Sequence, residues 1–107
     1  MTRIDTDRNL VTLINVFTVD PERQQPLVDL LVRATDETMS KLPGFISANI
    51  HRSLDGTRVT NYAQWRSQAD FEAMLRNPEA GQHMRQATEL ASFEPHLYEV
   101  VAVHGQD

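Results

Sequence analysis

Residues 45–65 have the sequence FISANIHRSLDGTRVTNYAQW, and this stretch decides the fold. Phe45 to Ser53 and Arg58 to Trp65 are rich in β-branched and aromatic residues, which favour strands. Asp55-Gly56 between two such runs is a strong β-hairpin signal. The stretch therefore predicts two antiparallel strands joined through residues 54–57.

The segment before the hairpin predicts a strand followed by a helix. Leu10 to Val19 is apolar and β-branched, which is typical of a strand covered on both faces. Asp20 then provides a side-chain cap for a helix that ends near Lys41. Pro26 opposes a carbonyl in this helix, so regular helix is expected to begin only near Gln24 or to bend there. The apolar face of the helix comprises Leu27, Leu30, Leu31, Ala34 and Thr38.

The segment after the hairpin predicts two short helices and a last strand. Ser67 caps the first helix, and Asn77-Pro78-Glu79 begins the second. Glu94-Pro95-His96 ends the second helix, and Leu97 to Val103 is apolar enough for the last strand. The apolar stripes are Phe71, Met74 and Leu75 on the first helix and Ala80, Met84, Ala87 and Ala91 on the second.

The order of these elements predicts an α+β, ferredoxin-like βαββαβ sandwich, with helices on one face of a four-stranded antiparallel sheet. Residues 1–9 are polar and aperiodic and are expected to form a flexible N-terminal arm, so the domain spans residues 10–107. The other sheet face is expected to be partly apolar, because it would carry Tyr62, Gln64, Tyr98, Val100 and Ala102. Such a face predicts a homodimer whose sheets stack.

Composition excludes several classes of function. The 107 residues carry 10 Lys and Arg against 15 Asp and Glu, and the scattered basic residues argue against nucleic-acid and membrane partners. The absence of cysteine removes disulfides, thiolate metal sites and thiol nucleophiles. No metal site is expected, because the four histidines lack ligand spacing. With no signal peptide and no apolar run of about 18 residues, we expect a cytoplasmic protein.

The strand over residues 58–65 contains the candidate site. Alternation places Asn61, Ala63 and Trp65 on one face. If the helices cover this face, an amide and an indole point inward as hydrogen-bond donors, over an apolar pocket. Alternatively, Trp65 only fills the core and Asn61 bonds to a nearby loop. Asn15 is a further candidate for the pocket wall. Alternatively, its side chain forms a hydrogen bond within the sheet and has no role in the pocket. The expected pocket walls are Leu31, Phe71, Met74 and Met84.

Three segments, VTLINVFTVDPE, LPGFISANIHRSLDGTRVTNYAQW and HMRQA, resemble the antibiotic biosynthesis monooxygenase family of the dimeric α/β-barrel superfamily. The resemblance runs from about Leu10 to Val103. It implies a ferredoxin-like fold, a dimer formed through the sheets, and oxidation of anthrones or quinols by molecular oxygen without metal, flavin or haem. It also implies catalytic roles for Asn61 and Trp65 and a substrate-binding role for Arg85.

One position departs from the family. The member closest in motif, an anthrone-oxidising monooxygenase, has a tyrosine where this chain has Phe71. A phenolic hydroxyl is therefore missing from the expected pocket, and His83 or His51 are substitutes for proton transfer. Arg85 lies beside the Met84 stripe rather than on it. The alternative to a substrate-binding role is therefore that Arg85 is a solvated residue on the helix surface.

The implied function is a cofactor-independent monooxygenase that oxidises an anthrone, quinol or related polycyclic aromatic, with oxygen as co-substrate. One alternative is a non-catalytic dimeric module that binds a small aromatic metabolite. A haem-degrading monooxygenase is less favoured. By register, the tryptophan and the ligating histidine of such enzymes fall on Met74 and Met84, and His83 is one residue away from the ligand position.

Overall fold

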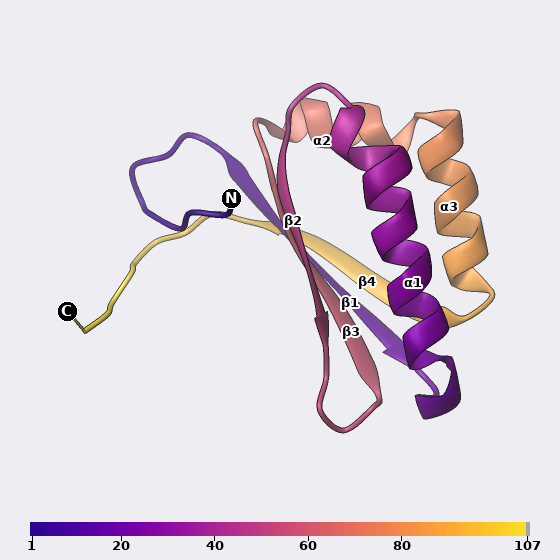
Figure 1. Cartoon of the computed structure of the whole chain (residues 1–107). Coiled ribbons are helices and arrows are strands. Elements are labelled where there is room, and N and C mark those ends of the chain that lie inside the picture. The colour runs from indigo at the N-terminus through magenta and orange to yellow at the C-terminus, as the bar shows by residue number, and fades with distance from the viewer. Residues whose placement is uncertain (107) are drawn as a thin grey trace.

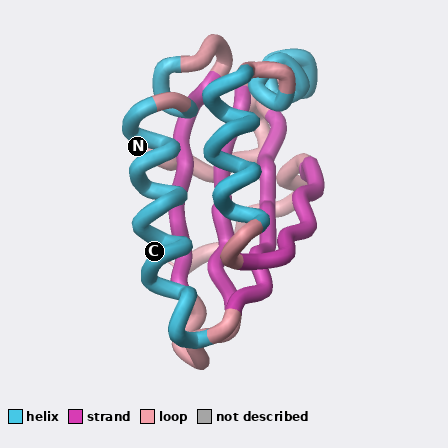
Figure 2. Tube along the Cα trace, turned by 90° about the vertical axis from the view of Figure 1, so that its right-hand side faces the viewer, coloured by secondary structure: helices cyan, strands magenta, loops and turns pink. Residues whose placement is uncertain are grey.

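Four strands form one antiparallel sheet in the computed structural model, which describes residues 1–106. They are β1 (Val11–Val19), β2 (Phe45–Arg52), β3 (Arg58–Trp65) and β4 (Ala91–Tyr98), in the order β2-β3-β1-β4. The helices α1 (Pro21–Glu37), α2 (Gln68–Leu75) and α3 (Pro78–Thr88) lie on one face of the sheet, and a 3-10 turn, η1 (Met39–Lys41), follows α1 (Figures 1 and 2). The α+β, ferredoxin-like βαββαβ prediction is confirmed.

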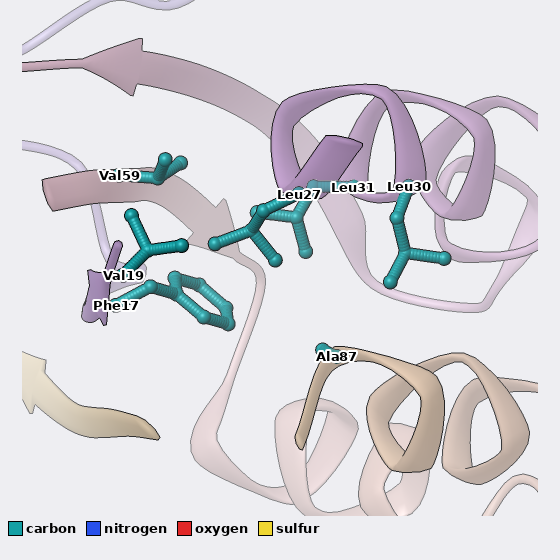
Figure 3. Close-up of a cluster of buried hydrophobic side chains, with 7 residues drawn as sticks. All are labelled: Phe17, Val19, Leu27, Leu30, Leu31, Val59 and Ala87. Atoms are coloured by element: carbon teal, nitrogen blue, oxygen red, sulfur yellow. The ribbon is translucent and has the colours of Figure 1, made fainter. Parts of the chain in front are cut away.

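Two apolar clusters join the helices to the sheet. Figure 3 shows the first cluster, which brings residues of β1, β3, α1 and α3 together. A second cluster lies between the sheet and the α2–α3 segment. Burying each large aliphatic side chain contributes roughly 1.5–3 kcal/mol, so these clusters hold the helix layer in place. The first cluster comprises Phe17, Val19, Leu27, Leu30, Leu31, Val59 and Ala87. The second comprises Leu13, Ala63, Trp65, Phe71, Met74 and Ala80.

The start of α1 differs from the prediction. The helix begins at Pro21 and continues past Pro26, so the expectation of a start near Gln24 is wrong. Pro26 is only the sixth helical residue and is exposed, so its ring disturbs one hydrogen bond near the helix start, on the solvent side. The expected side-chain cap is also wrong, because the backbone carbonyl of Asp20, rather than its carboxylate, accepts from the N–H of Arg23 at 2.9 Å.

The last strand lies earlier in the chain than predicted. β4 spans Ala91–Tyr98, whereas Leu97 to Val103 was expected, and α3 already ends at Thr88. Pro95 therefore lies inside a strand. The sheet tolerates this proline because β4 is an edge strand with a single neighbour, β1. The missing N–H therefore cannot interrupt hydrogen bonds to two neighbouring strands. As a consequence, Val100 and Ala102 lie beyond the sheet and are not part of its outer face.

The β2–β3 hairpin forms as predicted, and α1 braces it. Gly56 has a φ of +82°, which its turn position requires. The Asp55 carboxylate accepts from the Ser53 hydroxyl at 2.8 Å and from the backbone N–H and hydroxyl of Thr57 at 3.0 and 2.7 Å. These bonds, led by that of the Thr57 hydroxyl, lower the pKa of Asp55 to about 2. Buried Gln24 of α1 donates to the carbonyls of Ser53 and Arg58 at 3.1 and 3.0 Å.

The outer face of the sheet meets the N-terminal segment of the chain. Residues 1–10 form no helix or strand, and both ends of the described chain lie on the side of the sheet away from the helices (Figure 1). Gln64 donates to the backbone carbonyl of Arg3 at 2.8 Å, and Asn49 donates to the Thr2 hydroxyl at 2.5 Å. Among residues 1–106, no helix has the length and apolar character that a membrane crossing requires.

Asp55 is expected to make the stability of the hairpin dependent on pH. Its folded pKa of about 2 lies below the ordinary value of 3.8, so its contribution is present above about pH 4 and is lost as the pH falls through about 2. Asp55→Asn should therefore unfold more easily than the parent at pH 6, and the difference should shrink between pH 4 and 2. Urea titrations across this range measure it. The exposed Asp36→Asn is the control, and an equal pH dependence for both variants would contradict the assignment.

Two glycine substitutions are expected to have opposite effects. Gly44 has a φ of +85°, and a Cβ there would overlap the Cβ and Cγ atoms of Asp70. Gly44→Ala should therefore lower the free energy of unfolding by about 2 kcal/mol or more. Gly81 lies within α3, where a Cβ would come no closer than 3.6 Å to Arg85, so Gly81→Ala should raise it by about 0.5–1 kcal/mol. Thermal melts of both variants against the parent measure these shifts. A stabilised Gly44→Ala would contradict the role of Gly44 as a turn residue.

Candidate active site

A cavity of about 380 Å³ lies between the inner face of the sheet and the ends of the helices. This volume falls in the range of about 300–1,000 Å³ that is typical of small-molecule sites. The cavity walls are mainly apolar, which suits a flat hydrophobic ligand. The sheet contributes Leu13, Asn15, Phe45, Ala48, Asn61, Ala63, Trp65, Phe93, Pro95, His96 and Leu97. The helix layer contributes Thr35, Met39, Phe71, Met74, Leu75, Ala80, Gly81 and Met84.

Two amide side chains lie side by side at the sheet wall of this cavity. Asn15 of β1 and Asn61 of β3 are direct partners in the antiparallel register, and both line the cavity. The Oδ1 atom of each is buried and has no hydrogen-bond partner among the described residues. The alternatives, a loop bond for Asn61 and a sheet bond for Asn15, therefore do not hold for these oxygens. An unpaired buried acceptor costs about 1–3 kcal/mol, and a ligand hydroxyl would satisfy it.

Trp65 is held rigidly beside the amides. Its side chain is 2% exposed and packs edge-to-face against Phe45 and Phe71, with ring centroids at 5.6 and 6.3 Å. Trp65 belongs to the second apolar cluster and also lines the cavity. From the sequence, a core position and a pocket position are alternatives for Trp65. The structure combines them, because Trp65 fills the core and forms a wall of the pocket. Two aromatic neighbours fix the orientation of its indole ring.

The structure brings most of the predicted wall together. Phe71, Met74 and Met84 line the cavity as expected, whereas Leu31 does not. Leu31 packs in the first cluster, because the cavity lies nearer the C-terminal end of α1. One and two turns later along the chain, Thr35 and Met39 line the cavity instead.

Arg85 lies outside the cavity lining. The residue is exposed, as its surface alternative suggested, but its Nη1 atom is 3.6 Å from the position that a Cβ on Gly81 would take. Gly81 itself lines the cavity. The guanidinium therefore lies next to a lining residue without being part of the lining itself.

Neither histidine suggested for proton transfer lines the cavity. His51 is exposed on β2, where its register partner is Thr60, and its Nδ1 atom contacts the carbonyl of Asn49. His83 is half-buried between α1 and α3, with Nε2 3.0 Å from the Thr38 hydroxyl. That hydroxyl also donates to Glu79 at 3.3 Å, and Nδ1 of His83 is buried without a hydrogen-bond partner among the described residues.

Sequence reasoning missed the β4 side of the cavity. Phe93, Pro95, His96 and Leu97 all contribute to the lining, but His96 pairs with Ile14 in the register, so its side chain lies on the outer face, next to Tyr98 and Glu94. Alternation along β4 would have indicated Phe93 and Pro95. These residues were missed because the last strand was predicted after Pro95, at Leu97 to Val103. In the described part of the chain, no three His, Asp or Glu side chains gather in a way that could hold a metal ion.

Comparison with known proteins agrees with this geometry. Residues 10–86 match the family model described as antibiotic biosynthesis monooxygenase. Tetracenomycin-F1 monooxygenase from Streptomyces glaucescens is 43% identical over 105 residues, which cover 98% of this chain and 94% of that protein.

Solved structures show the same fold. The ActVA-Orf6 monooxygenase of Streptomyces coelicolor, determined with the ligand nanaomycin D, is 27% identical and superposes with a TM-score of 0.83, covering 94% of this chain and 95% of that one. SnoaB from Streptomyces nogalater, a cofactor-independent oxygenase, is 24% identical with a TM-score of 0.78, covers 92% and 99% of the two chains, and supports the fold alone. The chain is a monooxygenase and belongs to the antibiotic biosynthesis monooxygenase family.

Proposed function

We propose that this chain is a cofactor-independent monooxygenase that oxidises an anthrone, quinol or related polycyclic aromatic with molecular oxygen. The observation that carries the proposal is the pair of unpartnered amide oxygens of Asn15 and Asn61, next to Trp65, in an otherwise apolar cavity. Two relatives support it. The tetracenomycin-F1 enzyme is 43% identical, and the ActVA-Orf6 enzyme was determined with nanaomycin D.

The cavity lining suits a flat, hydroxylated ring system. Phe71, Met74 and Met84 offer apolar contacts to the faces of fused rings. The Oδ1 atoms of the two asparagines accept hydrogen bonds from ring hydroxyls, which a hydrocarbon could not supply. An aromatic substrate that carries hydroxyl groups therefore satisfies both the apolar walls and the buried amides.

The chemistry follows from the substrate more than from the protein. Triplet oxygen reacts slowly with closed-shell molecules, but a deprotonated, electron-rich ring can itself serve as the reductant. In the net reaction of an anthrone, a ring CH₂ group and O₂ give a ring carbonyl and water. The Asn61 amide N–H and the Trp65 indole N–H stabilise the developing oxyanion, each by about 2–4 kcal/mol in a dry site. Arg85 at the rim holds a carboxylate or carbonyl that projects from the opening.

Loss of the amide and of the indole should each reduce turnover. We expect Asn61→Ala to lower oxygen uptake with a panel of anthrones and hydroquinones by about 10²–10³-fold, because one oxyanion donor is removed. Trp65→Phe keeps an aromatic wall but lacks the N–H, and its rate should fall while the fold persists. An oxygen electrode with metal-stripped protein measures both variants.

The matched control for the amide is Asn9→Ala, which removes an exposed amide from the N-terminal segment. Its rate should equal that of the parent. Unchanged rates in both site variants would remove the oxyanion role. Absence of uptake above the spontaneous rate in the parent, combined with aromatic binding, would favour the non-catalytic binding module instead.

The outer sheet face supports a homodimer, as part of the same proposal. Ile14 and Tyr62 are direct partners on β1 and β3 on the side away from the helices, and both remain half-buried in the single chain. The N-terminal segment bonds to Gln64 and Asn49 on this face, and a second copy that covers the remaining apolar surface would add stability. The sheets of two copies would then stack face to face, with the helices outside.

A charge on the open face should separate the dimer. Ile14→Glu places a carboxylate at the centre of the proposed interface, where burial would strongly disfavour it. We expect the variant to sediment at the mass of one chain, and the parent at twice that mass. Val32→Glu is the control, because Val32 is an apolar residue of α1 that is 43% exposed on the helix side. A parent that sediments as a single chain would contradict the dimer.

A further inference from the structure

Gly81 is a glycine that the backbone of this chain does not require. Among the described residues, only Gly44 and Gly56 have a positive φ, so Gly81 has an ordinary helical conformation inside α3. A Cβ at position 81 would meet a single atom within 4 Å, Nη1 of Arg85, at the ordinary contact distance of 3.6 Å. Alanine would therefore fit and would favour the helix. The reason for a glycine here lies outside the stability of the helix.

The position of Gly81 supplies that reason, because it lines the cavity where the cavity meets solvent. Gly81 is half-buried, and the lining residues Leu75, at 57%, and Pro95 are exposed. These exposed residues mark the opening of the cavity. Because Gly81 has no side chain, α3 contributes only backbone to the cavity wall at this position. The opening is therefore wider than it would be with any other residue at position 81.

The same position separates the cavity from the guanidinium of Arg85. A Cβ of residue 81 would lie 3.6 Å from Nη1 of Arg85 with no other atom within 4 Å, so the space between this cavity-lining residue and the guanidinium is open. A larger side chain would fill this space and would also displace the guanidinium from the rim. Gly81 therefore leaves a passage that connects the apolar cavity to the charged group.

We propose that Gly81 is a specificity-determining residue, which keeps the opening wide enough for a substrate of three or more fused rings to extend from the amides to the rim. This inference rests on the proposed function, since it concerns the size of the same aromatic substrate. A substrate of one ring is smaller than the cavity of about 380 Å³ and can therefore bind beside the amides without passing residue 81. A side chain at position 81 therefore discriminates against the larger ring system.

The test compares a tricyclic anthrone with a one-ring hydroquinone in Gly81→Ala and Gly81→Leu. Adding methylenes to a filled space is costly, so the ratio of kcat/KM for the anthrone to that for the hydroquinone should fall at least about tenfold in Gly81→Leu, and less in Gly81→Ala. Gln82→Leu is the matched control, because Gln82 is the next residue of α3 and is exposed. It should keep the parent ratio. Equal losses for both substrates in Gly81→Leu would overturn the proposal.

A binding measurement separates this inference from the proposed function. Trp65 is the only tryptophan of the chain and lines the cavity, so quenching of its fluorescence reports occupancy without turnover. Anthraquinone should bind Gly81→Leu at least about tenfold more weakly than the parent, and benzoquinone about equally to both. If Gly81→Leu loses affinity for anthraquinone alone but the parent consumes no oxygen, the proposed function fails while selection by ring size at residue 81 stands. If turnover is present and anthraquinone binds both proteins alike, this inference fails alone.

Discussion

The antiparallel register between β1 and β3 is the constraint on which the site depends. It places Asn15 opposite Asn61 and Leu13 opposite Ala63, all on the face that the helices cover. Because side chains alternate along a strand, a slip of β3 by one residue against β1 would move Asn61 to the outer face and bring Tyr62 inward. The hairpin and its brace, the bonds from Gln24 to the turn, hold β3 in this register.

The cavity persists because the two apolar clusters lie on different parts of the sheet. Protein interiors are normally packed as densely as organic crystals, so an open space of about 380 Å³ needs a rigid frame. The first cluster anchors α1 and α3 to the sheet, and the edge-to-face stack of Phe45, Trp65 and Phe71 supports the other end. Small residues such as Ala48 and Gly81 then leave the space between them unfilled.

This arrangement explains how a chain without cysteine or a metal-ligand cluster in its described part can serve oxidation chemistry. The walls are mainly apolar, and at the sheet wall the amide oxygens of Asn15 and Asn61 have no hydrogen-bond partner among the described residues. In such a low-dielectric site, a few hydrogen bonds to a developing anion are worth more than they are in water. The same chemistry requires a substrate that supplies its own electrons, which favours electron-rich aromatic rings over saturated compounds.

The sequence by itself determined the elements whose signals are local. The hairpin over residues 45–65 and the side-chain caps at Ser67 and Asn77 followed from turn chemistry and capping. The inward face of β3, with Asn61 and Trp65, followed from alternation. Only the tertiary structure decided that α1 continues past Pro26 and that β4 contains Pro95. The helix tolerates Pro26 because this residue is exposed to solvent, and the sheet tolerates Pro95 because β4 is an edge strand. The tertiary structure also decided that Asn15 and Asn61 lie side by side and that Leu31 lies outside the cavity, since both depend on strand order and helix position, which are long-range properties.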